Sequence, residues 1–335
     1  MAFFLTLLRS QLLIKLPYPT WSFEGQTVII TGSNTGLGLE AARHIVRLSA
    51  AKVILAVRTI AKGEAAASSI IFSTRATKNT LEVWPLDLSD YESIKAFGAR
   101  LQTLDRMDAF IQNAGMLTNH FKVEGESGLE SHIAINAVGA VLVGLLALPK
   151  LKEIARQTGT RKRLSFIGSD LHFIAAFKEA EHDGSLLDVL SDEKIADMND
   201  RYRVSKLLLH YSVQHLAALT PLSSGSDVII TDATPGACES DLFRDDIGWL
   251  RSRIQPIVLK LFVRTTEVGS RALVHSVHPG LDPEAHGRLL MDCRVVADWE
   301  TVTGERGKAL RERWVGELWP RFEGIVPGVT AVLEH

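Results

Sequence analysis

Seven short runs of apolar and β-branched residues, separated by longer helical patterns, constrain the fold of this chain more than any other feature. Most of these runs are continuously apolar and do not alternate, which is typical of strands buried on both faces. Repeated strand–helix units with right-handed crossovers predict an α/β fold with a doubly wound parallel sheet and helices on both faces. The expected strands are Thr27–Thr31, Val53–Val57, Leu81–Leu86, Ala109–Gln112, Leu164–Gly168, Val228–Ala233 and Arg288–Asp292, and the clearest helices are Leu37–Leu48, Tyr91–Leu104, Ile133–Leu148 and Tyr202–Leu219.

The length of 335 residues and the absence of a repeat, a low-complexity tract or a Gly/Ser linker favour one large domain. We expect an apolar extension over residues 1–22, an α/β domain over 23–300 with a substrate lid near 236–268, and a helical extension over 301–335. In that last segment one side of a charged helical pattern is apolar, which predicts a capping helix. The apolar residues are Leu310, Trp314, Leu318 and Phe322. The polar, acidic segment from Leu171 to Asn199 is too long for a simple link and is expected to form an excursion near the active site.

Charge and cysteine content exclude several classes of function. The 37 basic and 39 acidic residues are interspersed and give a formal charge of -2, so the sequence lacks a basic field for nucleic acid. Cys238 and Cys293 have no partner spacing, which argues against a disulfide framework and a zinc site and fits a reducing, cytoplasmic compartment. The eleven histidines form no metal-ligand spacing, so we expect no metal.

Residues 1–17 are unusually apolar but are interrupted by Arg9 and Lys15. They match neither a spanning helix of about 20 apolar residues nor a secretory signal. Two interpretations stay open: a helix that packs its apolar side on the domain, or an amphipathic segment that lies on a membrane surface. A second apolar run, Ile133–Leu148, is short and contains Asn136, so we interpret it as a buried helix.

A glycine-rich segment links the first expected strand to the first expected helix. Glycines in such a loop let the backbone turn tightly and approach a pyrophosphate over the positive end of the helix. The strand before it and the helix after it are the context that a dinucleotide site of the Rossmann fold requires. The residues of this predicted phosphate loop are Gly32, Ser33, Asn34, Thr35, Gly36, Leu37 and Gly38.

The end of the second expected strand indicates which cofactor binds. An acidic residue there holds the ribose hydroxyls of NAD, whereas a basic residue suits the 2′-phosphate of NADP. Arg58 ends this strand with no Asp or Glu beside it, so NADP(H) is favoured, with Lys62 either assisting or simply solvated. Asp87, with Leu88 next to it, is placed to meet the adenine, and the adenosine floor is expected from Asn113, Ala114 and Gly115.

Tyr202 and Lys206 lie four residues apart and so project from one face of a helix. A tyrosine with a pKa near 10 is a poor base at neutral pH, and a neighbouring cation lowers that pKa. The same lysine is expected to hold the nicotinamide ribose. Such a pair is common by chance, because Tyr91 and Lys95 form another one in this chain.

Two further polar residues are candidates for the chemistry. Ser169 directly follows the fifth expected strand, at the edge where α/β sheets bind ligands, and its hydroxyl can donate to a substrate carbonyl. Asn136 lies in an apolar helix, where an amide is costly unless it is paired. A structural contact within the helix and a role in a proton relay stay open for Asn136. For Cys238, a small apolar filler is favoured over a reactive thiol.

From about Thr27 to Asp292 the sequence resembles the short-chain dehydrogenase/reductase family, and within it a retinol-dehydrogenase-like branch with fungal natural-product members. The resemblance implies that Tyr202 is the acid/base, that Lys206 tunes it and binds ribose, and that Ser169 orients the carbonyl. It also implies that Asn136 anchors a water relay to Lys206. The matching motifs are Thr31–Gly38, Asp87, Asn113–Gly115, Asn136, Ser169, Tyr202 with Lys206, and Pro235–Gly236, and the departures are Gln112, Gly168 and Asp170.

These observations predict an NADP(H)-dependent enzyme that interconverts a ketone or aldehyde and an alcohol, in secondary metabolism. The alternative is a non-redox isomerase, dehydratase or cyclase in which the cofactor is structural. The identity of the small-molecule substrate stays open. The resemblance also implies a homodimer through the helices that carry Asn136 and Tyr202, unless the Ile133–Leu148 run serves only as core.

Overall fold

The fold is built on an eight-stranded sheet, which the computed structural model describes together with its surroundings over residues 2–223, 225–239, 242 and 263–333. The strand order is β10-β9-β8-β7-β4-β1-β2-β3, and each pair except β9 with β10 is parallel. The order reverses between β1 and β4, so the doubly wound sheet is confirmed. The strands are β1 (Thr27–Thr31), β2 (Lys52–Val57), β3 (Leu81–Pro85), β4 (Ala109–Gln112), β7 (Lys162–Ile167), β8 (Val228–Thr234), β9 (Leu289–Met291) and β10 (Arg294–Val296).

The last expected strand, Arg288–Asp292, is wrong in its extent. The strand β9 ends at Met291, and the chain then reverses into the antiparallel strand β10. Asp292 and Cys293 carry the reversal with positive φ angles of 54° and 61°. Two consecutive left-handed residues form the tight turn that joins antiparallel strands. Neither residue is the glycine or asparagine that usually marks such a turn.

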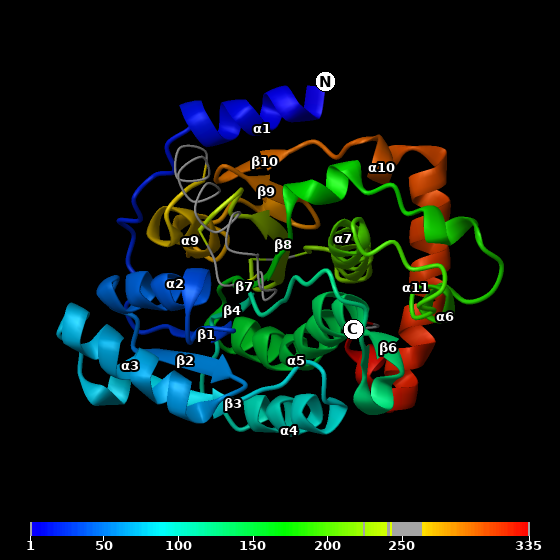
Figure 1. The fold of residues 1–335 in the computed structure, drawn as a ribbon. Coiled ribbons are helices and arrows are strands. Elements are labelled where there is room, and N and C mark those ends of the chain that lie inside the picture. Colours follow the sequence, from blue (N-terminus) through cyan, green and yellow to red (C-terminus); the bar gives the residue numbers. More distant parts are fainter. Residues whose placement is uncertain (1, 224, 240–241, 243–262, 334–335) are drawn as a thin grey trace.

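Helices cover both faces of the sheet (Figure 1). Alternate residues of β1 point to opposite faces, so Ile29 packs in one apolar core and Val28 and Ile30 pack in the other. The first core includes residues of α4 (Tyr91–Gln102), α5 (Ala140–Thr158) and α7 (Arg201–Leu219), and the second includes residues of α2 (Gly36–Arg47), α3 (Ile60–Thr74) and α9 (Thr266–His275). Shorter elements are η1 (Lys78–Thr80), β5 (Val123–Glu124), η2 (Gly125–Ser127), β6 (Leu129–Glu130) and η6 (Pro283–Ala285).

The apolar run at Ile133 forms one continuous helical segment, Ile133–Thr158. Its first part, η3 (Ile133–Gly139), is a π-helix, and it continues as α5. Among the described residues this is the one helix long and apolar enough to cross a membrane, but 83% of its most apolar window is buried inside the protein. The predicted buried helix is therefore present, and it extends ten residues beyond Leu148.

The C-terminal segment packs along one side of the domain (Figure 1). After α10 (Glu300–Thr303), the helix α11 (Glu305–Ile325) buries Leu310, Trp314, Leu318 and Phe322, and η7 (Val329–Leu333) follows. Trp314 donates a hydrogen bond of 2.9 Å to Ser212 on α7. The helix α11 packs against α7 and covers part of the surface expected for a homodimer, and the oligomeric state stays a prediction.

The segment from Leu171 to Asn199 lies largely away from where we expected it. It forms η4 (Asp170–Ile174), η5 (Lys178–Glu181) and α6 (Leu186–Val189). Glu317 of α11 accepts hydrogen bonds from the Ser185 hydroxyl and the Leu186 amide at 2.7 and 2.8 Å. Only the start of the segment reaches the active-site cavity described below. Arginines of α11 hold the segment through its backbone, as where Arg313 donates to the Ala180 carbonyl at 2.9 Å.

The N-terminal helix α1 (Ala2–Leu13) lies over β9, β10 and α9 (Figure 1). It docks through polar side chains: Ser10 is buried and donates to Asp292 at 2.7 Å, and the Gln11 carboxamide pairs with the backbone of Ala237. Leu7 and Leu8 are half-buried whereas Leu12 and Leu13 are exposed, so α1 has apolar residues on both sides and both interpretations of residues 1–17 stay open.

Candidate active site

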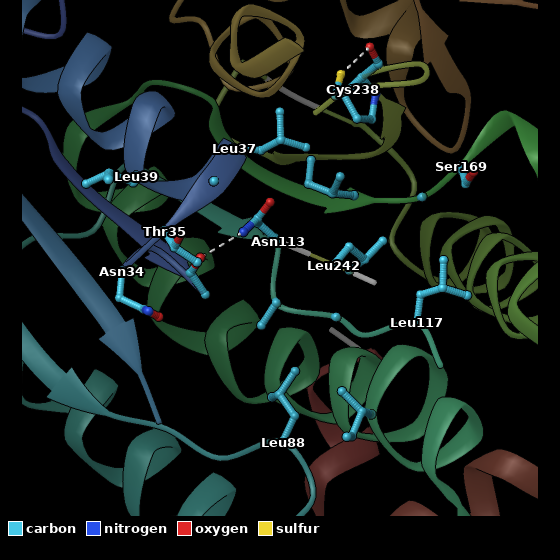
Figure 2. A pocket seen from close by; sticks show the side chains of 18 of the residues that line it. Asn34, Thr35, Leu37, Leu39, Leu88, Asn113, Leu117, Ser169, Cys238 and Leu242 are labelled. Atoms are coloured by element: carbon cyan, nitrogen blue, oxygen red, sulfur yellow. Dashed lines mark hydrogen bonds between the residues drawn. The ribbon is translucent and has the colours of Figure 1, made fainter. Parts of the chain in front are cut away.

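A cavity of about 1110 Å³ opens at the carboxyl ends of the parallel strands, around the point where their order reverses. Figure 2 shows residues from several of these strand ends around it, with Asn34 at one side and Ser169 at another. Open α/β sheets bind their ligands at this edge. The cavity therefore coincides with the place that the sequence predicted.

The glycine loop forms one wall of this cavity. Gly32 and Gly36 have φ angles of 63° and 59°, a conformation that side-chain-bearing residues rarely adopt. A Cβ on Gly32 would lie 2.9 Å from the Ala114 Cα, so the loop also requires glycine for close packing. Asn113 donates to the carbonyl oxygens of Thr31 and Gly32 at 2.9 and 3.2 Å and holds the loop in place.

Five of the seven predicted loop residues line the cavity, and two do not. The lining residues are Gly32, Asn34, Thr35, Gly36 and Leu37. Ser33 is buried, and its hydroxyl donates to the Ile30 carbonyl at 2.8 Å. Gly38 packs beneath the loop, where a Cβ would lie 2.6 Å from the Gly32 carbonyl oxygen. Both residues support the loop from behind, and their predicted contact with the cofactor stays a prediction.

The remaining residues predicted for the cofactor also line the cavity. They are Arg58, Asp87, Leu88, Asn113, Ala114, Gly115, Pro235 and Gly236, with Lys62 beside Arg58. The Arg58 side chain is exposed at the end of β2. One carboxylate oxygen of Asp87 accepts hydrogen bonds from the amide and hydroxyl of Ser89 at 3.0 and 2.7 Å. The cavity thus presents a guanidinium near one end of the glycine loop and a fixed carboxylate nearby.

Tyr202, Lys206 and Ser169 meet at the other part of the cavity. Burial raises the pKa of Tyr202 above its usual value, against a hydrogen bond with Ser169 that lowers it. The Lys206 ammonium lies 5.9 Å from the centre of the Tyr202 ring and donates to the Ile167 carbonyl at 2.7 Å. The expectation that Lys206 lowers the phenol pKa stays a prediction. The phenol is a neutral hydrogen-bond donor at physiological pH.

Asn136 does not line the cavity, although the sequence placed it in the site. Its carboxamide oxygen accepts from the Met116 amide at 2.8 Å, and its nitrogen donates to the Met116 carbonyl at 2.9 Å and to Ser205 at 3.1 Å. These bonds fix the strand-end loop after β4, where a Cβ on Gly115 would lie 3.1 Å from the same carboxamide oxygen. The structural role left open for Asn136 is thus present. Its side chain stands in a π-helix, a feature frequent at functional sites.

A buried ionic network behind Lys206 was missed from the sequence. His210 lies one helical turn beyond Lys206 on α7, bonded to Asp232 at 2.8 Å and to Asp298 at 3.0 Å. Burial lowers the pKa of His210, but these two carboxylates outweigh it and raise the pKa to about 9. Burial lowers the pKa of Lys206 to about 8, and Asp232 opposes that fall. The spacing of Tyr202, Lys206 and His210 at every fourth residue was the signal that could have revealed this network.

Two histidine rings stack in this network, and their pKa values are shifted in opposite directions. The rings of His172 and His210 are 4.6 Å apart and nearly parallel, at 14°. Burial, with the His210 charge, lowers the pKa of His172 to about 3, so its ring is neutral. Its Nδ1 bonds the Ser169 carbonyl oxygen at 2.6 Å and therefore carries the proton. His172 thus helps to fix the backbone that presents the Ser169 hydroxyl.

Other cavity residues were noted only in passing, or not at all, from the sequence. Asp170 lines the cavity and is buried, which raises its pKa to about 6, and its Oδ2 has no partner among the described residues. Burial raises the pKa of Cys238 to about 12, so its side chain is a thiol at neutral pH. Leu7 of α1 also lines the cavity. Of the expected lid over 236–268, residues 240–241 and 243–262 lie outside the described residues.

Comparison with known proteins places the site in a family. Residues 26–161 match the family model for short chain dehydrogenases. Short chain dehydrogenase/reductase dmxR8 of Cryptosporiopsis sp. (strain 8999) is 40% identical over 332 residues, covering 97% of this chain and 98% of the relative. Short chain dehydrogenase atnD of Emericella nidulans is 40% identical over 280 residues, covering 83% of this chain and 87% of the relative.

A solved structure gives the same result at the level of the fold. The NADPH-bound carbonyl reductase from chicken fatty liver superimposes with a TM-score of 0.57 at 19% identity, covering 82% of this chain and 94% of that one. The glycine loop, the strand-end cavity and the Tyr202–Lys206–Ser169 group occur here in one molecule whose relatives match it over nearly its whole length. The chain belongs to the short-chain dehydrogenase/reductase family of oxidoreductases.

Proposed function

We propose that this protein is an NADP(H)-dependent carbonyl reductase or alcohol dehydrogenase. The observation that carries the proposal is the convergence of Tyr202, Lys206 and Ser169 on the cavity that the glycine loop also lines. A dinucleotide fits this cavity, because Gly32 and Gly36 leave the loop without side chains and the pyrophosphate can approach the N-terminus of α2. When bound, the nicotinamide supplies or accepts a hydride.

The protein's own groups then control the oxygen and the proton. The Ser169 hydroxyl donates to the carbonyl oxygen of the substrate, an interaction that strengthens as that oxygen gains negative charge. The buried Tyr202 phenol is protonated and gives its proton to the same oxygen during reduction. Lys206 lines the cavity beside Tyr202, and its ammonium, held by the Ile167 carbonyl, binds the nicotinamide ribose. In the oxidation direction each of these transfers is reversed.

The choice of NADP(H) over NAD(H) rests on Arg58. Its guanidinium lines the cavity at the end of β2, is exposed, and makes no hydrogen bond within the described part of the chain. A planar, permanently charged fork suits the 2′-phosphate, and no carboxylate at this strand end competes for ribose hydroxyls. Lys62 lines the same end and adds positive charge.

A panel of ketones and aldehydes, including aromatic and polyketide-like carbonyls, tests the proposal when NADPH consumption and product structure are both followed. Loss of NADPH in step with alcohol formation supports it. Conversion of a substrate with no change in NADPH supports instead an isomerase, dehydratase or cyclase on this fold. The full-length similarity to fungal dehydrogenases further favours a role in secondary metabolism and directs the panel to natural-product carbonyls.

A further inference from the structure

The N-terminal helix α1 carries leucines on its outward side as well as on the side that meets the protein. On a 100° helical wheel Leu7, Ser10 and Gln11 fall on one side, and this side faces the protein. Leu5, Leu12 and Leu13 fall on the other side and are 60%, 50% and 77% exposed. We call these three leucines the outer face of α1. Surface helices of globular proteins normally bury their leucines and expose their polar residues, so this arrangement needs a partner.

The attachment of α1 explains why the leucines cannot turn inward. The Ser10 hydroxyl donates to Asp292, and Arg264 donates to the Ser10 carbonyl at 2.8 Å and to Asp292 at 2.6 Å. All three residues are buried. Rotating the helix to bury the outer face would separate Ser10 from this buried ion pair and leave its charges with fewer hydrogen-bond partners. The docked orientation is therefore fixed, and the outer face stays in contact with whatever surrounds the protein.

The charges beside the outer face indicate the chemistry of the surface that it contacts. Arg9 and Lys15 are exposed beside the leucines, and the first acidic residue of the chain is Glu24. Leucines flanked by cations and free of acids are the composition of helices that lie in the interface of an anionic bilayer. Long basic side chains extend their charges to the headgroups while their stems stay with the apolar residues.

We propose that the outer face of α1 docks the protein on an anionic membrane surface, with the helix lying parallel to the bilayer. Leu7, on the opposite side of the same helix, lines the active-site cavity. The membrane and the cavity are then separated by one helix, about 10 Å across. An enzyme held in this way receives carbonyl compounds that partition into lipid.

Co-sedimentation of the full chain with vesicles tests the proposal. Vesicles of phosphatidylcholine containing phosphatidylserine should bind the protein, and vesicles of phosphatidylcholine alone should bind it at least about tenfold more weakly. Leu12→Ser with Leu13→Ser should weaken binding to the anionic vesicles at least about tenfold. Arg9→Gln with Lys15→Gln should remove most of the preference for phosphatidylserine.

Phe72→Ser is the matched control, because Phe72 on α3 is 89% exposed and lies outside the outer face. It should leave vesicle binding unchanged, and all variants should keep the thermal unfolding temperature of the parent. Absence of binding to any vesicle overturns the proposal, and so does an equal loss of binding in Phe72→Ser. A parent dimer that becomes a monomer in Leu12→Ser/Leu13→Ser overturns it as well, because the outer face would then pair with a second copy.

Discussion

Replacing His210 with glutamine should remove a pH-dependent part of the stability of this protein. The imidazole lies between Asp232 and Asp298, and its pKa rises from 6.5 to about 9 in the folded protein. Below pH 6.5 the folded and the unfolded chain both carry this proton, and the stabilisation is fully present. Between pH 6.5 and 9 only the folded chain keeps it, so stability falls as pH rises. The rise in pKa corresponds to roughly 3 kcal/mol of unfolding free energy.

Urea unfolding followed by fluorescence of the six tryptophans measures this contribution at pH 6 and at pH 9.5. The difference in unfolding free energy between the parent and His210→Gln should shrink by roughly 3 kcal/mol from the lower to the higher pH. Taking the difference cancels the titrating groups that lie outside the His210 network. His120→Gln is the control, because His120 is exposed and lies outside the His210 network. A parent-to-variant difference that is the same at both pH values would refute the reasoning.

Three further predictions concern the chemistry, the cofactor and the assembly. Tyr202→Phe should lower turnover by about 10² to 10⁴ with NADPH affinity nearly unchanged, because it deletes the proton donor and keeps the ring; a folded variant with full reductase activity would exclude Tyr202 as the acid. The parent should bind NADPH at least about tenfold more tightly than NADH, and Arg58→Asp should invert that order in a fluorescence titration of both cofactors; equal affinities in the parent contradict the role of Arg58. Light scattering at micromolar concentration should give a monomer near 36.8 kDa in the absence of lipid, because α11 covers α7, and a dimer mass would show that pairing uses another surface.

Residues at the ends of buried parallel strands could be located from sequence alone. Continuous apolar runs such as Val53–Val57 indicate where each strand ends, and the polar residue that follows must then lie at one edge of the sheet. Arg58, Asp87 and Ser169 were found in this way, and all three line the cavity. These positions could be predicted because each depends only on the strand that directly precedes the residue in the sequence.

Residues whose position depends on distant contacts could not be located in this way. Asn136 lies in an apolar run, but its carboxamide is directed by Met116 and Ser205, which the sequence does not connect to it. Ser33 has the right place in the loop but turns to the Ile30 carbonyl. The orientation of helix α1 is set by Ser10, which contacts the ion pair between Arg264 and Asp292. Composition predicts an amphipathic helix there, and only the surface beneath it decides which side faces inward.

The contact between Ser10 and Asp292 also sets an order for folding. The two residues are 282 positions apart, so α1 can dock only after other contacts have offset the entropy lost in closing this long loop. Asp292 belongs to the turn between β9 and β10, which forms on the edge of a sheet that must already contain β8. The helix α1 is synthesised before the sheet and is therefore among the last elements to reach its place. Throughout synthesis of the sheet its leucines stay accessible, to a bilayer or to a chaperone, before any active site exists.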